Sequence, residues 1–178
     1  AQTAGYRSRA AFKLIQLDDK YRFLRTGAHV IDLGAAPGGW TQVAVARAGE
    51  TGRVVALDLA EFDIVPGAIC LTGDIRASEM HAQLQNKLGG LADVILSDMA
   101  APAVGHAKTD HLRVMALAEA AHDCARSLLV EKGTFVVKLL QGGADRELLT
   151  ALKLEFRHAR HVKPPASRSD SREIYLVA

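Results

Sequence analysis

The sequence predicts an α/β fold in which a mostly parallel, seven-stranded sheet carries helices on both of its faces. Three observations favour this fold. Short apolar runs typical of buried strands alternate with longer segments of helical periodicity. A glycine-rich turn, "DLGAAPGGW", follows the first of these runs, at the end of the sheet where open α/β folds bind ligands. The last two strand-like segments have no helix between them, which predicts an antiparallel hairpin at one edge.

The individual elements follow from local patterns. Residues 8–21 have helical spacing, and Ser8 is placed as the N-cap of that helix. Because the chain shows no repeat, low-complexity tract or long linker, we expect a single domain over residues 1–178. Strands are expected over 29–34, 53–59, 68–74, 92–98, 133–140, 158–163 and 172–178. Further helices are expected over 40–49, 77–88, about 110–130 and 145–156.

The composition disfavours several classes of protein. No apolar run approaches the roughly 20 residues of a membrane span. The basic segment "YRSRAAFK" is not followed by an apolar core, so we predict no signal peptide. The two cysteines, Cys70 and Cys124, show no metal-ligand or disulfide-framework spacing. We therefore expect a cytoplasmic monomer with reduced thiols, no metal and no membrane contact.

The net charge of +2 is distributed unevenly along the chain. Residues 1–30 carry six Lys or Arg and two Asp, and residues 153–178 carry six Lys or Arg and three acidic residues. The centre is therefore net negative. Basic ends around an acidic centre indicate that the termini meet a polyanion, although a solvated surface would produce the same pattern. The basic helical segment 1–27 is the first candidate for that contact.

The glycine-rich turn departs from the G-x-G-x-x-G pattern that cradles a dinucleotide pyrophosphate. It contains Gly34, Pro37, Gly38 and Gly39, and both the proline and the spacing disfavour a phosphate cradle. A cofactor that carries adenosine and an amino acid but no phosphate fits this turn better. Trp40, the only tryptophan, would form a wall of the pocket or simply pack the start of the helix.

Aspartates follow three further strands. Asp58 closes the second strand, where a carboxylate can accept both hydroxyls of a ribose. Asp74 follows the third strand, near the expected adenine edge, and Asp98 follows the fourth. Each alone could cap a helix, but together they meet at the ligand-binding end of a parallel sheet. With their neighbours Leu59 and Ile75 they predict an S-adenosylmethionine pocket. A dinucleotide dehydrogenase is the rival on this fold, disfavoured by the glycine spacing and the hairpin.

The residues around this pocket narrow the reaction. No Asp/Asn-Pro-Pro-aromatic motif follows the fourth strand, which disfavours methylation of base amines. Cys70 and Cys124 lie within a predicted strand and helix, which disfavours carbon-5 methylation by a cysteine nucleophile. Lys138 ends an apolar run and could simply cover apolar surface with its stem. Beside a methyl donor, however, Asp98 and Lys138 suit the deprotonation of a hydroxyl.

The motifs "RSRAAFKL", "DLGAAPGGW", "SDMA", "FVVKLLQGG" and "KPPASRSDSREIYLVA" resemble those of the FtsJ family of ribose 2′-O-methyltransferases. The resemblance runs from about Tyr6 to the last residue. It implies a Rossmann-like class I methyltransferase that uses S-adenosylmethionine and modifies a uridine of large-subunit ribosomal RNA. It also implies a catalytic tetrad of Lys13, Asp98, Lys138 and Glu173. A second ammonium and the sulfonium of the cofactor would both disfavour the protonated form of Lys138.

The resemblance further implies RNA contacts beside the tetrad, at Arg7 and Arg9 and at Arg168 and Arg172. Few aromatics and a modest net charge favour recognition of a preformed RNA or ribosomal surface over free single strands. Family members extend a little at both ends with basic residues, so we expect the natural chain to be slightly longer. Two alternatives stay open: a transfer RNA 2′-O-methyltransferase with the same tetrad, and a noncatalytic RNA-binding assembly factor.

Overall fold

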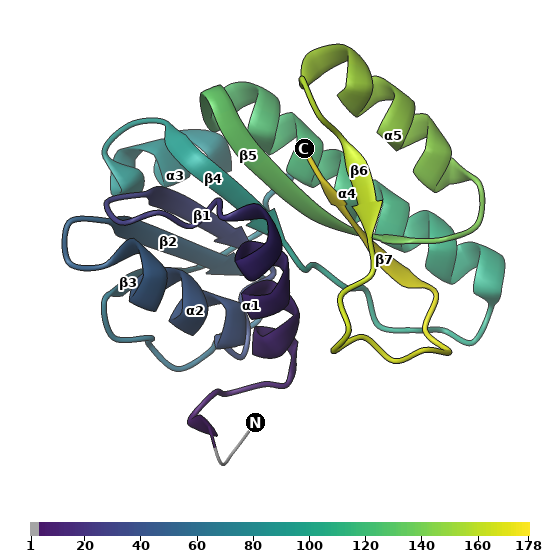
Figure 1. Ribbon diagram of the computed structural model, residues 1–178, viewed down its shortest axis with the longest axis horizontal. Helices are drawn as coiled ribbons and strands as arrows, with labels where there is room; N and C mark the ends of the chain where they lie inside the picture. Colours follow the sequence, from purple (N-terminus) through teal and green to yellow (C-terminus); the bar gives the residue numbers. More distant parts are fainter. Residues whose placement is uncertain (1–3) are drawn as a thin grey trace.

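The computed structural model describes residues 4–178, so the first three residues of the predicted basic segment lie outside the described part. Its seven strands form one sheet. They are β1 (His29–Leu33), β2 (Arg53–Asp58), β3 (Ala68–Thr72), β4 (Ala92–Ser97), β5 (Leu129–Leu140), β6 (Arg160–Val162) and β7 (Glu173–Val177). Their order across the sheet is β3-β2-β1-β4-β5-β7-β6 (Figure 1).

The first five strands are parallel, and β7 runs antiparallel between β5 and β6. The predicted sheet with an antiparallel terminal hairpin is therefore confirmed. Because β7 enters next to β5 rather than at the edge, its side chains come into register with those of β5. Lys138 pairs with Tyr175, and Leu140 pairs with Glu173.

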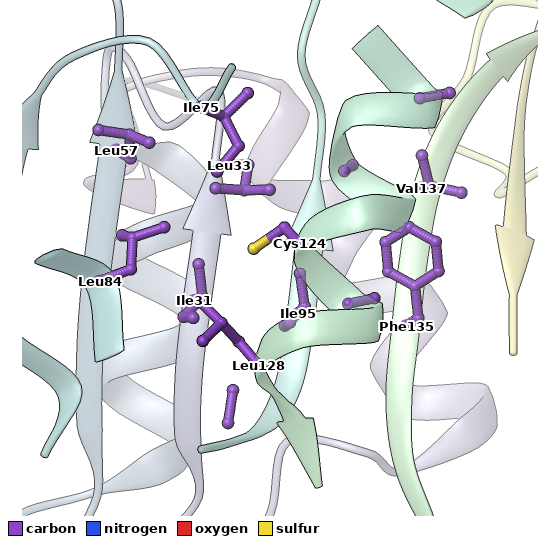
Figure 2. Packing of buried hydrophobic residues seen from close by; sticks show 14 of the residues in the cluster. Ile31, Leu33, Leu57, Ile75, Leu84, Ile95, Cys124, Leu128, Phe135 and Val137 are labelled. Carbon is purple, nitrogen blue, oxygen red and sulfur yellow. The ribbon is translucent and has the colours of Figure 1, made fainter. Parts of the chain in front are cut away.

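Helices cover both faces of the sheet (Figure 1). Those of the described chain are α1 (Ala10–Tyr21), α2 (Gly39–Ala48), α3 (Met80–Leu88), α4 (Ala107–Leu128) and α5 (Ala144–Glu155). Helices α1 and α2 pack on one face with apolar side chains such as Val30 and Val136. Helices α3, α4 and α5 pack on the other, and Figure 2 shows Cys124 and Leu128 of α4 among Ile31, Ile95 and Phe135.

The period of two along β5 assigns its side chains to these two cores. Phe135 and Val137 belong to the α3–α5 side, whereas Val136 belongs to the α1–α2 side. Lys138 alternates with Val137 and therefore points toward the face that α1 covers. Its position near the carboxyl end of β5 explains how a lysine can follow three buried apolar residues.

Some predicted boundaries were wrong for identifiable reasons. Ser8 does not cap α1: Arg9 occupies the N-cap position without a side-chain hydrogen bond, and the Ser8 side chain packs against Gly39 instead. Helix α4 begins before Asp110 because the ring of His106 accepts a hydrogen bond from the Thr109 amide. Helix α3 starts three residues late, after a turn. Strand β5 begins directly after α4, across an irregular register with β4.

Candidate active site

A cavity of about 180 Å³ opens at the carboxyl ends of the parallel strands. Parallel strands end at the same edge of a sheet, so residues far apart in sequence meet there. Six of the predicted cofactor residues line the cavity: Gly34, Asp58, Leu59, Asp74, Ile75 and Asp98. Met99, Ala100 and Leu117 add apolar walls that the sequence analysis missed, because no local pattern marks them.

Asp58 holds the two backbone segments that border the cavity. Its Oδ2 accepts a hydrogen bond from the Ala36 amide and its Oδ1 accepts one from the Ala60 amide, both at 2.9 Å. The remaining lone pairs of this carboxylate can accept the hydroxyls of a ribose. Asp58 thus supports the glycine-rich turn and supplies acceptors to the cavity at the same time.

Asp74 lies at the cavity but its carboxylate is already engaged. The Arg76 guanidinium donates to both of its oxygens, at 3.0 and 3.1 Å, and the Arg76 amide donates at 2.9 Å. These hydrogen bonds lower the pKa of Asp74. The carboxylate therefore stays ionised, and Arg76 would compete with an adenine amino group for it.

The glycine-rich turn is shaped by protein contacts as well as by the cavity. Gly34 has a φ of 77°, and a Cβ there would lie 2.7 Å from the Met99 Cα, so only glycine leaves this wall open. A Cβ on Gly38 would meet Val65 and Arg7 instead. Pro37, Gly38, Gly39 and Trp40 were predicted to bind cofactor, but in the described chain they are not among the residues that line the cavity.

Trp40 takes the packing role that the sequence analysis kept as its alternative. The side chain is 2% exposed, its Nε1 donates to the Ala10 carbonyl at 2.8 Å, and its ring centroid lies 5.6 Å from that of Tyr175. It joins α1 to α2 and β7 beneath the site. Trp40 does not line the cavity of residues 4–178.

Asp32 is fully buried at the end of β1. Its Oδ2 accepts a hydrogen bond from the Thr41 hydroxyl at 2.7 Å, and its Oδ1 has no partner among the described residues. Burial raises the pKa of Asp32 to about 7; the Thr41 bond opposes this shift, and the charges of Asp98 and Asp58 add to it. The folded protein therefore keeps this carboxyl protonated in weakly acidic solution.

Asp32→Asn is expected to stabilise the protein at neutral and alkaline pH. Between about pH 4 and 7 the unfolded carboxyl has lost its proton while the folded one keeps it, so wild-type stability falls as pH rises. Below about pH 4 both states are protonated and no stability is lost through this group. Denaturant unfolding should show an advantage for the variant that grows by on the order of 2–4 kcal/mol across this range. An advantage that does not change with pH would contradict the assignment.

The tetrad predicted from the sequence comes together on the α1 face of the sheet. Lys138 is paired with Tyr175 across β5 and β7, and Glu173 lies two residues from Tyr175 along β7. Paired residues and residues two apart point to the same face of a sheet, so Lys138 and Glu173 share that face. Asp98 follows β4 directly, and β4 lies next to β5. Helix α1 places Lys13 beside Glu173, the first residue of β7. Four distant segments thus deliver two amines and two carboxylates to one place.

The distances within the tetrad form a continuous chain of charges. Lys138 Nζ lies 3.5 Å from Asp98 Oδ1 and 3.7 Å from Glu173 Oε1, and it donates to the Asp98 carbonyl at 3.3 Å. Lys13 Nζ lies 3.3 Å from Glu173 Oε2. The Lys138 side chain is 7% exposed, so it is the most enclosed of the four groups. Glu173 connects the two amines.

Two further features set the protonation of this cluster. Burial would raise the pKa of Glu173, but the charges of Lys138 and Lys13 outweigh it and hold that pKa below its usual range. The Tyr175 hydroxyl donates to Asp98 Oδ1 at 2.7 Å, and burial together with Asp98 raises the pKa of Tyr175 well above 10. Tyr175 therefore remains a donor that orients Asp98. The sequence analysis missed it, although it shares a strand face with Glu173.

A second hollow of about 460 Å³ adjoins the tetrad on the side of Lys13 and Glu173. Arg9 and Arg168, two of the four arginines predicted to contact RNA, line it. Asp98 lines the first cavity and Lys13 lines the second. The tetrad therefore lies between the cavity at the strand ends and a hollow lined by three cations and by the carboxylates of Asp170 and Glu173.

The other two predicted RNA contacts, Arg7 and Arg172, bind backbone carbonyls of the protein. Arg7 donates to Pro37 at 3.1 Å, to Ile64 at 2.8 Å and to Asp63. Arg172 donates to the Gln141 carbonyl through two of its nitrogens. Arg7 thereby ties the N-terminal segment to the glycine-rich turn and to the loop after β2.

Arg7→Ala is expected to weaken S-adenosylmethionine binding about 5-fold to 10-fold, because the loop that carries Leu59 loses hydrogen bonds from a charged donor. Calorimetric titration measures the dissociation constant of S-adenosylmethionine for each variant. Arg9→Ala is the matched control: Arg9 is exposed beside the hollow, so its loss should leave cofactor affinity within about 2-fold. Equal cofactor affinities for the two variants would show that Arg7 does not organise the loop.

Neither cysteine lines the cavity or the hollow. Cys70 is partly buried in β3, and burial in α4 raises the pKa of Cys124 to about 12, so this thiol is not a nucleophile at neutral pH. Residues 4–178 contain no group of three or more His, Cys, Asp and Glu side chains placed to hold a metal ion. No helix in that range is both long and apolar enough to cross a membrane.

The sheet order, the reversed seventh strand and the strand-end carboxylates around a cavity define a methyltransferase of the Rossmann-like class. Comparison with known proteins makes this specific. A family model described as FtsJ-like methyltransferase matches residues 6–178. The chain belongs to this family, as the motifs of its sequence predicted.

Relatives and solved structures agree with this assignment. The chain is 54% identical to ribosomal RNA large subunit methyltransferase E of Paramagnetospirillum magneticum, covering all of this chain and 75% of that protein. It is 53% identical to the protein of the same name from Parvibaculum lavamentivorans, covering 74% of it. The crystal structure of a ribosomal RNA methyltransferase from Plasmodium falciparum superposes with a TM-score of 0.85 at 32% identity, over 97% of this chain and 96% of that one.

Proposed function

We propose that this protein transfers a methyl group from S-adenosylmethionine to the 2′-hydroxyl of a ribose, at a uridine of large-subunit ribosomal RNA. The observation that carries the proposal is the position of Lys138. Its amine is enclosed between Asp98, which lines the cavity at the strand ends, and Glu173, which lines the hollow beside Lys13. The names of the relatives support the ribosomal substrate.

The residues around the cavity fit S-adenosylmethionine. Asp58 offers carboxylate oxygens for the ribose of the cofactor, and the apolar Leu59, Ile75 and Met99 offer contacts for its adenine. Gly34 leaves the wall beside them open. Asp98 reaches the same cavity and supplies a negative charge for a cationic group. When bound, the cofactor supplies a methyl group on a positively charged sulfur.

The protein's part in the reaction is to hold the hydroxyl and accept its proton. In this mechanism Lys138 takes the proton of the 2′-hydroxyl as the ribose oxygen gains the methyl group that the bound cofactor would supply. Asp98 and Glu173 position the Lys138 amine, and Tyr175 fixes Asp98. Because charge is neutralised as the bond forms, alignment of the reacting atoms supplies much of the rate, on the order of 7–11 kcal/mol.

The hollow beside the tetrad is the proposed place of the RNA backbone. Arg9, Lys13 and Arg168 present three cations there, which suits phosphates that flank the reacting ribose. The described part of the predicted basic segment, residues 4–27, supplies two of these three groups. Arg7 and Arg172 would contribute by shaping the borders of the site rather than by direct contact.

The proposal is tested by transfer of labelled methyl from S-adenosylmethionine to large ribosomal subunits that lack the modification, followed by nucleoside analysis. The expected product is 2′-O-methyluridine. Label in transfer RNA would retain the chemistry and change the substrate. Cofactor binding without transfer to any RNA would overturn the catalytic proposal in favour of a binding factor.

A further inference from the structure

A hollow of about 670 Å³ lies at the amino-terminal end of β5, opposite the end of the sheet that carries the methyl-transfer site. It is bordered by the end of α1, the start of β5 and the segment that follows α5. Figure 1 marks the C-terminus beside these elements. We call it the amino-edge cleft. Its floor is aromatic, with Tyr21, Phe23 and Phe156.

Cations dominate the rim of the amino-edge cleft. Lys132, Arg157 and Arg160 are exposed and line it, and Arg22 and Arg25 line the hollow that continues from it past Tyr21. The opposing carboxylates are fewer. Glu155 is already paired with Arg126 and His122, which leaves Glu131 as the exposed acidic side chain of the rim. The continuing hollow adds the exposed Asp93, which accepts a hydrogen bond from the His29 amide. An excess of positive charge without bound carboxylates attracts a polyanion.

Backbone conformation singles out two of these cations. Within residues 4–178, Arg22 (φ 53°) and Lys132 (φ 67°) are the non-glycine residues with positive φ. This conformation costs about 1–2 kcal/mol for a residue with a Cβ and favours glycine. Both residues belong to the same basic edge. Arg22 is the left-handed C-cap of α1 and its amide donates to the Asp18 carbonyl, so the end of the helix accounts for its conformation. At both positions a long cationic side chain stands where a glycine would fit the backbone better.

The aromatic ring of Tyr21 holds a third cation of this cleft, Arg160, in place. The Arg160 guanidinium carbon lies 5.6 Å from the centroid of the Tyr21 ring, and Lys20 Nζ lies 5.4 Å from the same ring. A guanidinium stacked on an aromatic face keeps its N–H groups free at the edges, where they can grip a phosphate in a fixed geometry. Lys132 lies on an irregular part of β5, and such irregularities re-aim a side chain.

We propose that the amino-edge cleft binds the phosphate backbone of the RNA substrate as a second contact, remote from the tetrad. This inference rests on the proposed function in taking RNA as the substrate. A contact at both ends of the sheet would let a large folded RNA hold the protein in one orientation. The contact adds affinity but takes no part in methyl transfer.

Lys132→Gly tests this with little risk to the fold, because glycine suits the observed backbone conformation. It is combined with Arg157→Gln on the same rim. Methyl transfer to unmodified large subunits should show a KM raised about 3-fold to 10-fold by the pair, with kcat unchanged. Binding of protein-free large-subunit RNA, measured from 50 to 200 mM KCl, should lose about one unit of salt slope for each cation removed.

Lys87→Gln is the control for the loss of one exposed cation that does not line the cleft, whereas the double variant removes two. Its KM and salt slope should equal those of the wild type. The inference is overturned if the double variant keeps the wild-type KM and slope. It is also overturned if binding weakens only for intact subunits and not for protein-free RNA, which would indicate a ribosomal protein as the partner. If the wild type methylates no RNA, the proposed function fails, and the salt slopes alone then decide on the cleft.

Discussion

Lys138→Ala is expected to lower the rate of methyl transfer by about 10²- to 10⁴-fold while leaving S-adenosylmethionine affinity within about 3-fold. The amine that would accept the 2′-hydroxyl proton is lost, whereas Asp58 and the apolar walls of the cavity are untouched. Single-turnover transfer to unmodified subunits measures the rate, and calorimetric titration measures cofactor binding. Lys87→Ala, at an exposed position of α3, is the control for loss of a lysine.

The Lys138→Arg variant tests whether Lys138 acts as a proton acceptor or only as a positive charge. Arginine keeps the charge next to Asp98 and Glu173 but is not deprotonated at neutral pH, so it cannot accept a proton. We expect this variant to be as slow as the alanine variant. Recovery of most of the wild-type rate would mean that Lys138 acts through its charge alone. The melting temperature of each variant is measured as well, because removing one partner of an enclosed ion pair also destabilises the fold.

Asp58→Asn is expected to weaken S-adenosylmethionine binding by about 100-fold. Both carboxylate oxygens accept backbone amides, from Ala36 and from Ala60, and an amide side chain can satisfy only one of them. The other N–H then faces a donor, the turn loosens, and the ribose loses an ionised acceptor. Each of these two losses is worth about 1–2 kcal/mol, or roughly tenfold.

Asp63→Asn is the matched control for that measurement. Asp63 lies on the loop after β2, is exposed, and contributes its backbone carbonyl to Arg7. The substitution is the same and lies only five residues further along the chain, but it should change the dissociation constant less than about 2-fold. A loss below 3-fold for Asp58→Asn would place the ribose of the cofactor elsewhere.

Much of the fold could be predicted because its signals are local. Alternation of apolar runs and helical periods predicts the strands and helices, and the missing helix before the last strand predicts its reversal. The convergence of Asp58, Asp74 and Asp98 follows from parallel pairing alone. The tetrad came from resemblance to a family, and the structure explains it by register: Lys138 and Glu173 share one face of paired strands.

Other features depended on contacts that no local pattern carries. Trp40 lies in a glycine-rich ligand turn, yet its indole packs against α1 and Tyr175. Arg7 lies beside exposed Arg9 in the same basic segment, yet its guanidinium binds three carbonyls of the protein. Ser8 has the composition of a cap, but it packs against Gly39. In each case a partner more than 25 residues away decided what the side chain does.

The sequence by itself determined the class of fold, the order of its elements, the end of the sheet that holds the site and the family. These follow from periodicity, turn chemistry and motifs, which act between residues close along the chain. Only the tertiary structure decided which polar groups remain available. In the folded chain Asp74 is hydrogen-bonded to Arg76, and one oxygen of Asp32 has no partner among the described residues. The cations of the amino-edge cleft come from separate segments of the chain. Hydrogen bonds and burial have ranges of a few ångströms, so they depend on which distant segments the fold brings together.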